Sequence, residues 1–174
     1  MGKENEAVIL SAARTPIGKF QGALSGIPAT KLGAMAVKAA VERAGIKTED
    51  VEEVIMGNVV QAGEGQAPAR QAGIWGGIPA TVGASTVNKV CGSGLKAAML
   101  ASQAVRAGDA DLFIAGGFES MSRAPFLVNG RSGELKFGNQ QLTDALQNDG
   151  LWDPFENWSM GNAAEFIGDE YEVT

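Results

Sequence analysis

The sequence contains no histidine and only one cysteine, and both shortages restrict the chemistry open to the chain. Histidine is the commonest general base and a common metal ligand, so catalysis here needs a proton acceptor from elsewhere, and we expect no metal site. One cysteine cannot form an internal disulfide, which fits a reducing compartment. The first residues, MGKENEAVIL, lack the basic region and long apolar run of a secretory signal. We therefore expect a cytoplasmic protein.

Basic residues are also scarce, and the formal net charge is −6 at pH 7. No basic stripe is present that would replace phosphate counterions, which argues against a nucleic-acid-binding protein. No stretch has the length and apolarity of a membrane span. With 174 residues, of which 45% are hydrophobic, the chain can bury one substantial core. We expect a globular protein that engages neither nucleic acid nor membrane.

Residues 7–120 alternate between short apolar runs and longer segments with helical spacing, which predicts βαβ units and a mainly parallel sheet. The pattern predicts strands at 7–13, 54–60, 81–87 and 112–115, and helices at 31–44, 68–72 and 93–107. Gly45 and Gly108 follow two of these helices, where a helix commonly ends. Small residues on several faces of the helix at 93–107 predict that it is central and closely packed on more than one side.

After residue 121 the sequence becomes polar, glycine-containing and aromatic, with no long periodic segment before a helix-like stretch at 162–170. We therefore divide the chain into an α/β domain, residues 1–120, and a loop-rich part, residues 121–174. About fifty residues of weak structure are uncommon in a compact domain unless they serve binding or assembly.

Cys91 lies between the predicted strand at 81–87 and the predicted helix at 93–107. A lone cysteine is often an inert core residue. At a helix start, however, the unpaired N–H groups and the helix dipole favour a thiolate. The same N–H groups can supply part of an oxyanion hole, and Gly92 and Gly94 leave room for a substrate carbonyl. This setting indicates a nucleophile.

The segment around this cysteine, VNKVCGSGLKA, resembles the acyl-enzyme segment of thiolases. Three further segments agree with that family in the same order: RTPIGKF, GNVVQAGEGQAPARQA and AGGFESMSRAP. The resemblance covers essentially the whole chain. It implies the thiolase-like α/β fold, in which each of two similar βαβαβαββ halves has a mixed, mainly parallel sheet, and a loop domain is inserted in the first half. The chain would supply the first half and much of that insertion.

The resemblance also implies an activity: acyl transfer between acyl-CoA and CoA or acetyl-CoA, giving acetoacetyl-CoA formation or 3-ketoacyl-CoA thiolysis. Cys91 would form the acyl-enzyme, with coenzyme A thioesters as substrates and no cofactor. In the family the activating histidine, a second cysteine and an asparagine come from the carboxy-terminal half. The missing histidine is then expected, and these residues alone should be inactive. The family further implies a homodimer or homotetramer and a place in fatty acid metabolism.

The resemblance assigns two substrate-binding residues in the loop-rich part. Leu151 aligns with a position that contacts coenzyme A, and Met160 aligns with a methionine that lines the acyl pocket. The alternative for both is local core of the loop domain. Ser159 stands where many biosynthetic members have histidine, so the preferred acyl chain stays open.

Other functions compete with this interpretation. Gly116 and Gly117 follow a predicted strand but lack the GxGxxG spacing of a dinucleotide site, so close packing near the sulfur is the better explanation. A ketoacyl or hydroxymethylglutaryl synthase of the same superfamily also uses a cysteine here. The missing histidine equally suits a non-catalytic acyl-CoA-binding or scaffold subunit.

Overall fold

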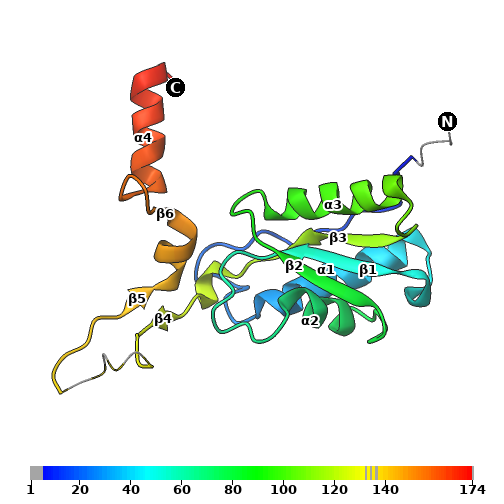
Figure 1. Ribbon diagram of the computed structural model, residues 1–174, viewed down its shortest axis with the longest axis horizontal. Helices are drawn as coiled ribbons and strands as arrows, with labels where there is room; N and C mark the ends of the chain where they lie inside the picture. The colour runs from blue at the N-terminus through cyan, green and yellow to red at the C-terminus, as the bar shows by residue number, and fades with distance from the viewer. Residues whose placement is uncertain (1–5, 132, 134, 136, 174) are drawn as a thin grey trace. The chain divides into compact units, whose positions relative to one another are not determined.

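The computed structural model describes residues 6–131, 133, 135 and 137–173. It comprises two compact units, Met1–Arg123 (unit 1) and Ala124–Thr174 (unit 2). Unit 1 has a parallel sheet in the order β2-β1-β3. Its elements are α1 (Ala29–Ala44), η1 (Thr48–Asp50), β1 (Glu53–Gly57), α2 (Pro68–Trp75), β2 (Gly83–Val87), α3 (Ser93–Ala107), β3 (Phe113–Gly117) and η2 (Met121–Arg123) (Figure 1).

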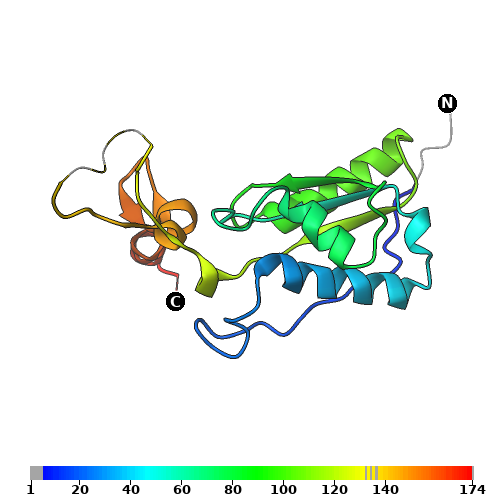
Figure 2. The same cartoon turned by 90° about the horizontal axis from the view of Figure 1, so that it is seen from below.

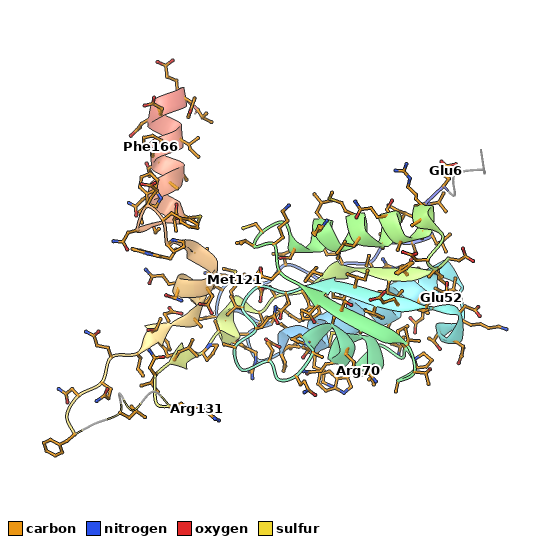
Figure 3. The ribbon with its side chains drawn as sticks, in the orientation of Figure 1. Glu6, Glu52, Arg70, Met121, Arg131 and Phe166 are labelled. Atoms are coloured by element: carbon orange, nitrogen blue, oxygen red, sulfur yellow. The ribbon has the colours of Figure 1, made fainter. Side chains whose placement is uncertain are left out.

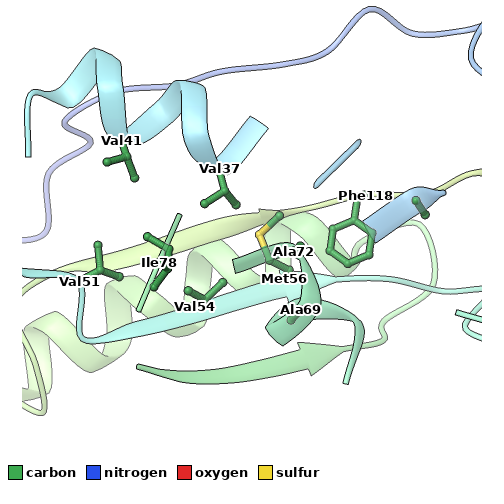
Figure 4. Close-up of a cluster of buried hydrophobic side chains, with 10 residues drawn as sticks. Val37, Val41, Val51, Val54, Met56, Ala69, Ala72, Ile78 and Phe118 are labelled. Atoms are coloured by element: carbon green, nitrogen blue, oxygen red, sulfur yellow. The ribbon is translucent and has the colours of Figure 1, made fainter. Parts of the chain in front are cut away.

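The sheet of unit 1 is covered on both faces, by α1 and α2 on one side and by α3 on the other (Figures 1 and 2). The larger core lies under α1 and α2 and is drawn in Figure 4: Ala29, Val37, Val41, Val51, Val54, Met56, Ala69, Ala72, Ile78 and Phe118. A smaller core of Ile55, Ala97 and Ala101 lies under α3. Alternate side chains of β1 therefore pack into opposite layers, as expected for a strand buried on both faces.

The predicted helices of unit 1 are confirmed. Gly45 and Gly108 end α1 and α3 in the left-handed conformation, with φ of 65° and 81°. A residue with a Cβ would be strained there, so glycine suits both ends. The predicted strands at 54–60, 81–87 and 112–115 are also present, with boundaries that differ by a few residues. No helix in the described part of the chain has the length and apolarity that a bilayer crossing requires.

The predicted strand at 7–13 is wrong, because the structure assigns no strand to the described residues of that segment. The segment is tied to α1 instead. The Ser11 hydroxyl donates to the Ala40 carbonyl at 2.6 Å, and the Arg43 guanidinium donates to the Ala12 carbonyl at 2.8 Å. Val8 and Ile9 are 69% and 89% exposed. The apolar run therefore has a helix beside it and no neighbouring strand in the described ladder.

The prediction that the helix at 93–107 is packed on more than one side is also wrong for the described chain. The residues of α3 that are buried are Ser93, Ala97 and Ala101, which face the sheet. Leu95 is 70% exposed and Met99 is 47% exposed. In the described part of the chain, the buried residues of this helix lie on its sheet side, and its opposite, apolar side is uncovered at Leu95 and Met99.

Unit 2 consists of short elements and one helix. Two small antiparallel ladders pair β4 (Phe126–Leu127) with β5 (Thr143–Asp144), and β6 (Trp152–Asp153) with β7 (Trp158–Ser159). A π-helical turn, η3 (Gln147–Leu151), precedes β6, and α4 (Met160–Tyr171) follows β7. The predicted helix at 162–170 is confirmed as α4. The division of the chain at residue 120, with an inserted loop domain after it, stays a prediction about the full-length protein.

Candidate active site

Cys91 lies in the turn that joins β2 to α3, and its side chain is exposed. Side chains on both sides of it hold this turn. The side-chain oxygen of Asn88, Oδ1, accepts from the Val90 N–H at 2.9 Å. The Ser93 hydroxyl accepts from the Lys89 N–H at 2.8 Å and donates to the Val90 carbonyl at 2.6 Å. Ser93 itself is 4% exposed. The sulfur is thus open to solvent while the backbone that carries it is anchored.

Val90, the residue before Cys91, has a φ of 45°. A β-branched residue in the left-handed region is a true outlier, because its side chain crowds the adjacent carbonyl. Such conformations persist only where the surroundings hold them, and they concentrate at functional sites. The strain supports the interpretation that the turn exists to present Cys91; the catalytic role of this residue stays a prediction.

Two N–H groups at the start of α3 are engaged within the turn. The Gly92 N–H donates to the Lys89 carbonyl and the Ser93 N–H to the Val90 carbonyl, each at 3.0 Å. The expectation that the first N–H groups of this helix contribute to an oxyanion hole is therefore wrong for these two. An oxyanion hole beside Cys91 needs other donors.

Two glycines let the start of α3 lie directly on the ends of two strands. A Cβ on Gly57, at the end of β1, would lie 2.5 Å from the Ser93 carbonyl carbon and 2.6 Å from the Gly94 nitrogen. A Cβ on Gly117, at the end of β3, would lie 3.2 Å from the Gly94 Cα. The prediction that Gly116 and Gly117 permit close backbone packing is confirmed for Gly117. It is not confirmed for Gly116, where a Cβ would meet only the Met56 side chain at 3.5 Å. The backbone at the ends of β1 and β3 therefore determines how closely the start of α3, which follows the Cys91 turn, approaches the sheet.

A second polar group lies at the same edge of the sheet and was not identified from the sequence. Asn58 follows β1 and is 1% exposed. Its side-chain N–H groups donate to Glu119 Oε1 at 2.9 Å and to the Phe118 carbonyl at 3.4 Å. Glu119, which follows β3, also accepts from the N–H groups of Val59 at 2.8 Å and Val60 at 3.3 Å. Because β1 and β3 are parallel neighbours, residues sixty positions apart meet here.

Burial raises the pKa of the Glu119 carboxyl above its ordinary value of 4.5. The N–H groups of Val59 and Val60 oppose this rise, and the charge of Glu64 adds to it. Burial also raises the pKa of Glu64, against the lowering effects of the Thr30 N–H and the charge of Arg123. Two desolvated carboxyls therefore lie near the carboxyl end of the sheet.

The two predicted substrate-binding residues belong to unit 2, whereas Cys91 belongs to unit 1. Leu151 is the last residue of η3 and is 38% exposed, and Met160 is the first residue of α4 and is 40% exposed. Neither is buried as a core residue would be. Their roles in substrate binding stay predictions.

Ser159, the residue that departs from the family's common histidine, caps α4. Its hydroxyl accepts from the Asn162 N–H at 3.2 Å and donates to the Asn162 side-chain carbonyl at 2.7 Å. The Asn162 side chain also accepts from the Ser159 N–H at 3.3 Å, which completes a capping box. Trp158 packs beside it on Phe166, with ring centroids 5.7 Å apart. A serine at position 159 therefore has a structural role, which is to cap the start of α4.

Within the described ranges, no group of three or more histidine, cysteine, aspartate or glutamate side chains is arranged to hold a metal ion. The acidic side chains with raised pKa are instead bonded to backbone N–H groups.

Comparison with known proteins identifies the family. Residues 7–174 match the model of the thiolase amino-terminal domain. The chain is 54% identical, over 169 residues, to an acetyl-CoA acetyltransferase of Cupriavidus necator, and 51% identical, over 169 residues, to a probable acetyl-CoA acetyltransferase of Escherichia coli. Each alignment covers 97% of this chain and 43% of the relative.

A solved structure agrees with the sequence comparison. The Acat5 thiolase from Ascaris suum, crystallised in complex with coenzyme A, superposes with a TM-score of 0.92 and is 44% identical. That alignment covers 97% of this chain and 44% of the solved chain. The chain thus spans less than half the length of the relatives that it matches. With its family model, its relatives and its α/β fold in agreement, the chain belongs to the thiolase family.

Proposed function

We propose that the full-length protein is a thiolase of the acetyl-CoA acetyltransferase type, which transfers an acyl group between acyl-CoA and CoA or acetyl-CoA through an acyl-enzyme on Cys91. One observation carries the proposal: the only cysteine of a thiolase-family chain is exposed on a strained turn at the start of a helix. Exposure and a helix start are what a thiolate nucleophile requires.

In the proposed reaction the Cys91 sulfur, as a thiolate, attacks the thioester carbonyl. A bond forms between this sulfur and the acyl carbon, the bond to the coenzyme A sulfur breaks, and coenzyme A leaves as a thiol after taking up a proton. A second coenzyme A thiol, or the carbanion of acetyl-CoA, then removes the acyl group and frees Cys91. Thiolysis and its reverse, synthesis, share the acyl-enzyme on Cys91. The reaction consumes no oxidant and uses no resident metal or cofactor.

We propose that the proton acceptor for Cys91 comes from outside these residues, since the sequence has no histidine, the commonest general base. We propose that it belongs to a carboxy-terminal half, in keeping with relatives more than twice as long as this chain. The uncovered apolar side of α3 supports a partner of that kind, since apolar helix faces in soluble proteins are normally covered. We further propose a homodimer or homotetramer, in the cytoplasm, with a role in fatty acid metabolism.

Substrate contacts are proposed in unit 2. Leu151 would contact coenzyme A and Met160 would line the acyl pocket. Both are apolar side chains that are more than one-third exposed at the ends of their elements, so both are accessible to a ligand. The Ascaris suum thiolase, which was crystallised with coenzyme A, supports this class of ligand.

The test is to trap the acyl group in the full-length protein. After brief incubation with labelled acetyl-CoA, peptide mass spectrometry should find the label on Cys91 and none in the Cys91→Ala variant. Ser102→Ala, on α3, is the matched control and should be labelled like the wild type. Labelling that survives in Cys91→Ala would refute the proposal.

A non-catalytic acyl-CoA-binding or scaffold subunit is the alternative, and the absence of histidine favours it. The same measurement separates the two functions. A scaffold would bind acetyl-CoA without acylation of Cys91, whereas an enzyme would show the labelled peptide and release acetoacetyl-CoA.

A further inference from the structure

The Glu119 carboxylate accepts several hydrogen bonds near the turn that carries Cys91. Its carboxylate receives donors from three consecutive residues, through the Asn58 side chain and the N–H groups of Val59 and Val60. Three donors need both carboxylate oxygens, and an amide at this position would offer only one acceptor. Glu119 therefore fixes the segment that leaves β1.

That segment connects to the Cys91 turn. The Val59 carbonyl accepts from the Asn88 side-chain N–H at 3.4 Å, and Oδ1 of the same Asn88 side chain accepts from the Val90 N–H at 2.9 Å. Val90 is the strained residue beside Cys91. A continuous path of hydrogen bonds thus runs from Glu119, through Val59 and Asn88, to the backbone conformation that presents the sulfur.

The buried amide of Asn58 shows how strongly this arrangement is held. Among the described residues its Oδ1 has no hydrogen-bond partner, although the atom is buried. A buried acceptor without a partner costs free energy. The bonds from its N–H groups to Glu119 and Phe118 fix the amide in that orientation. In this orientation Asn58 Oδ1 stays unpaired, while the Asn58 side-chain N–H donates to the Glu119 carboxylate.

We propose that Glu119 is a positioning residue of the acyl-transfer site, which acts on Cys91 through the Asn58–Val60 segment and Asn88 and holds the turn in its reactive geometry. This inference rests on the proposed function, because it assigns Glu119 a part in the acylation of Cys91. A group that orients a nucleophile changes the rate of the chemical step more than it changes substrate binding, and misplacement by about 1 Å can cost about a hundredfold.

Glu52 provides a matched control. Its carboxylate also accepts from two backbone N–H groups, those of Asp111 at 2.6 Å and Leu112 at 3.1 Å. It directly precedes β1, at the opposite end of the sheet from the Cys91 turn (Figure 3). Glu52→Ala therefore removes the same kind of bond without touching the path to Cys91.

The experiment measures single-turnover acylation of Cys91 by acetyl-CoA in the full-length protein, together with kcat and KM. We expect Glu119→Ala to slow acylation and lower kcat by about ten- to a hundredfold, with KM changed by less than about threefold. Glu119→Gln, which keeps one acceptor, should lie between Glu119→Ala and the wild type. Glu52→Ala should acylate at the wild-type rate.

Asn88→Ala tests the path with an exposed residue whose loss should not prevent folding. We expect it to slow acylation, and the double variant Asn88→Ala/Glu119→Ala to be no more than about twofold slower than the slower single variant, because both changes interrupt one path. The proposal is overturned if Glu119→Ala acylates like Glu52→Ala, or if the two effects multiply. If the wild-type protein does not acylate Cys91, the proposed function fails instead.

Discussion

The backbone of Val90, the residue before Cys91, has a conformation that valine disfavours. Its φ of 45° lies in a region that asparagine tolerates far better than valine does. Since Val90 is 51% exposed, little burial is lost on replacing it. We expect Val90→Asn to raise the free energy of unfolding of the full-length protein by about 1 kcal/mol.

Urea unfolding measures this difference. Val8→Asn is the control, because Val8 is 69% exposed and has no positive φ, so the same exchange relieves no strain there. Equal or lower stability of Val90→Asn relative to Val8→Asn would show that the turn is not strained in solution.

Glu119 should make stability depend on pH. Its folded-state pKa is raised by burial above 4.5, so between these two pKa values the folded state binds more protons than the unfolded state does. Its contribution is fully present below the unfolded pKa and is lost as pH rises through the folded pKa. Glutamine does not titrate. The free energy of unfolding of the wild type minus that of Glu119→Gln should therefore fall as pH rises from about 4 to 7.

Urea titrations of both proteins at each pH give this difference directly. The change from glutamate to glutamine also alters hydrogen bonds, but that effect is a constant offset across the series. A difference that stayed flat or increased with pH would mean that burial does not raise the pKa of Glu119.

At Gly57 the backbone of β1 lies directly against the start of α3, so this position should not tolerate even a methyl group. In Gly57→Ala the new Cβ would lie within 2.6 Å of the backbone of Ser93 and Gly94, which cannot move as a side chain would. We expect a loss of about 1–3 kcal/mol in the free energy of unfolding and slower acylation of Cys91. Gly83→Ala, on β2, meets only the Glu53 Cγ at 3.9 Å and should be nearly neutral.

Ser159 and Asn162 stabilise the first turn of α4 through their reciprocal hydrogen bonds. Ser159→Ala removes the hydroxyl that accepts from the Asn162 N–H. The free energy of unfolding should therefore fall by about 1 kcal/mol. Circular dichroism during thermal unfolding measures this loss. Ser159→Asp keeps an acceptor and should retain most of the stability; equal losses in both variants would argue against the capping role.

Helices were easier to predict than strands, for a physical reason. The helix at 93–107 is specified locally, by its apolar spacing and by Gly108 at its end. A strand also needs a partner, and the apolar run at 7–13 lies against α1 instead. Cys91 was recognised because its surroundings are contiguous in sequence. Glu119 and Asn58 were missed because only the parallel pairing of β1 with β3 brings them together.

The described chain leaves an apolar surface on α3, and this surface affects the behaviour of the 174-residue polypeptide. Leu95 and Met99 lie on its uncovered side. Exposed apolar patches of this kind drive association in water. We expect the 174-residue chain alone to associate and to show no thiolysis, and Leu95→Lys/Met99→Lys to reduce the association.

Sedimentation velocity at several concentrations measures the association. Leu95→Lys/Ala98→Lys is the control: it adds the same charge, with one lysine at the exposed, small residue Ala98, but keeps Met99. It should associate more than the variant without Met99. Thiolysis by the isolated wild-type chain would contradict the assignment of the missing proton acceptor to other residues.

The glycines at the ends of β1 and β3 also bear on how enzymes of this kind diverge. Since a Cβ at Gly57 or Gly117 would lie 2.5–3.2 Å from the start of α3, an exchange at either glycine should displace the backbone that follows Cys91. On the proposed function, changes in the preferred acyl group should then arise among the residues proposed to contact the substrate, such as Met160 at the start of α4. The position of the proposed nucleophile would then stay constant while the preference for the acyl group changes.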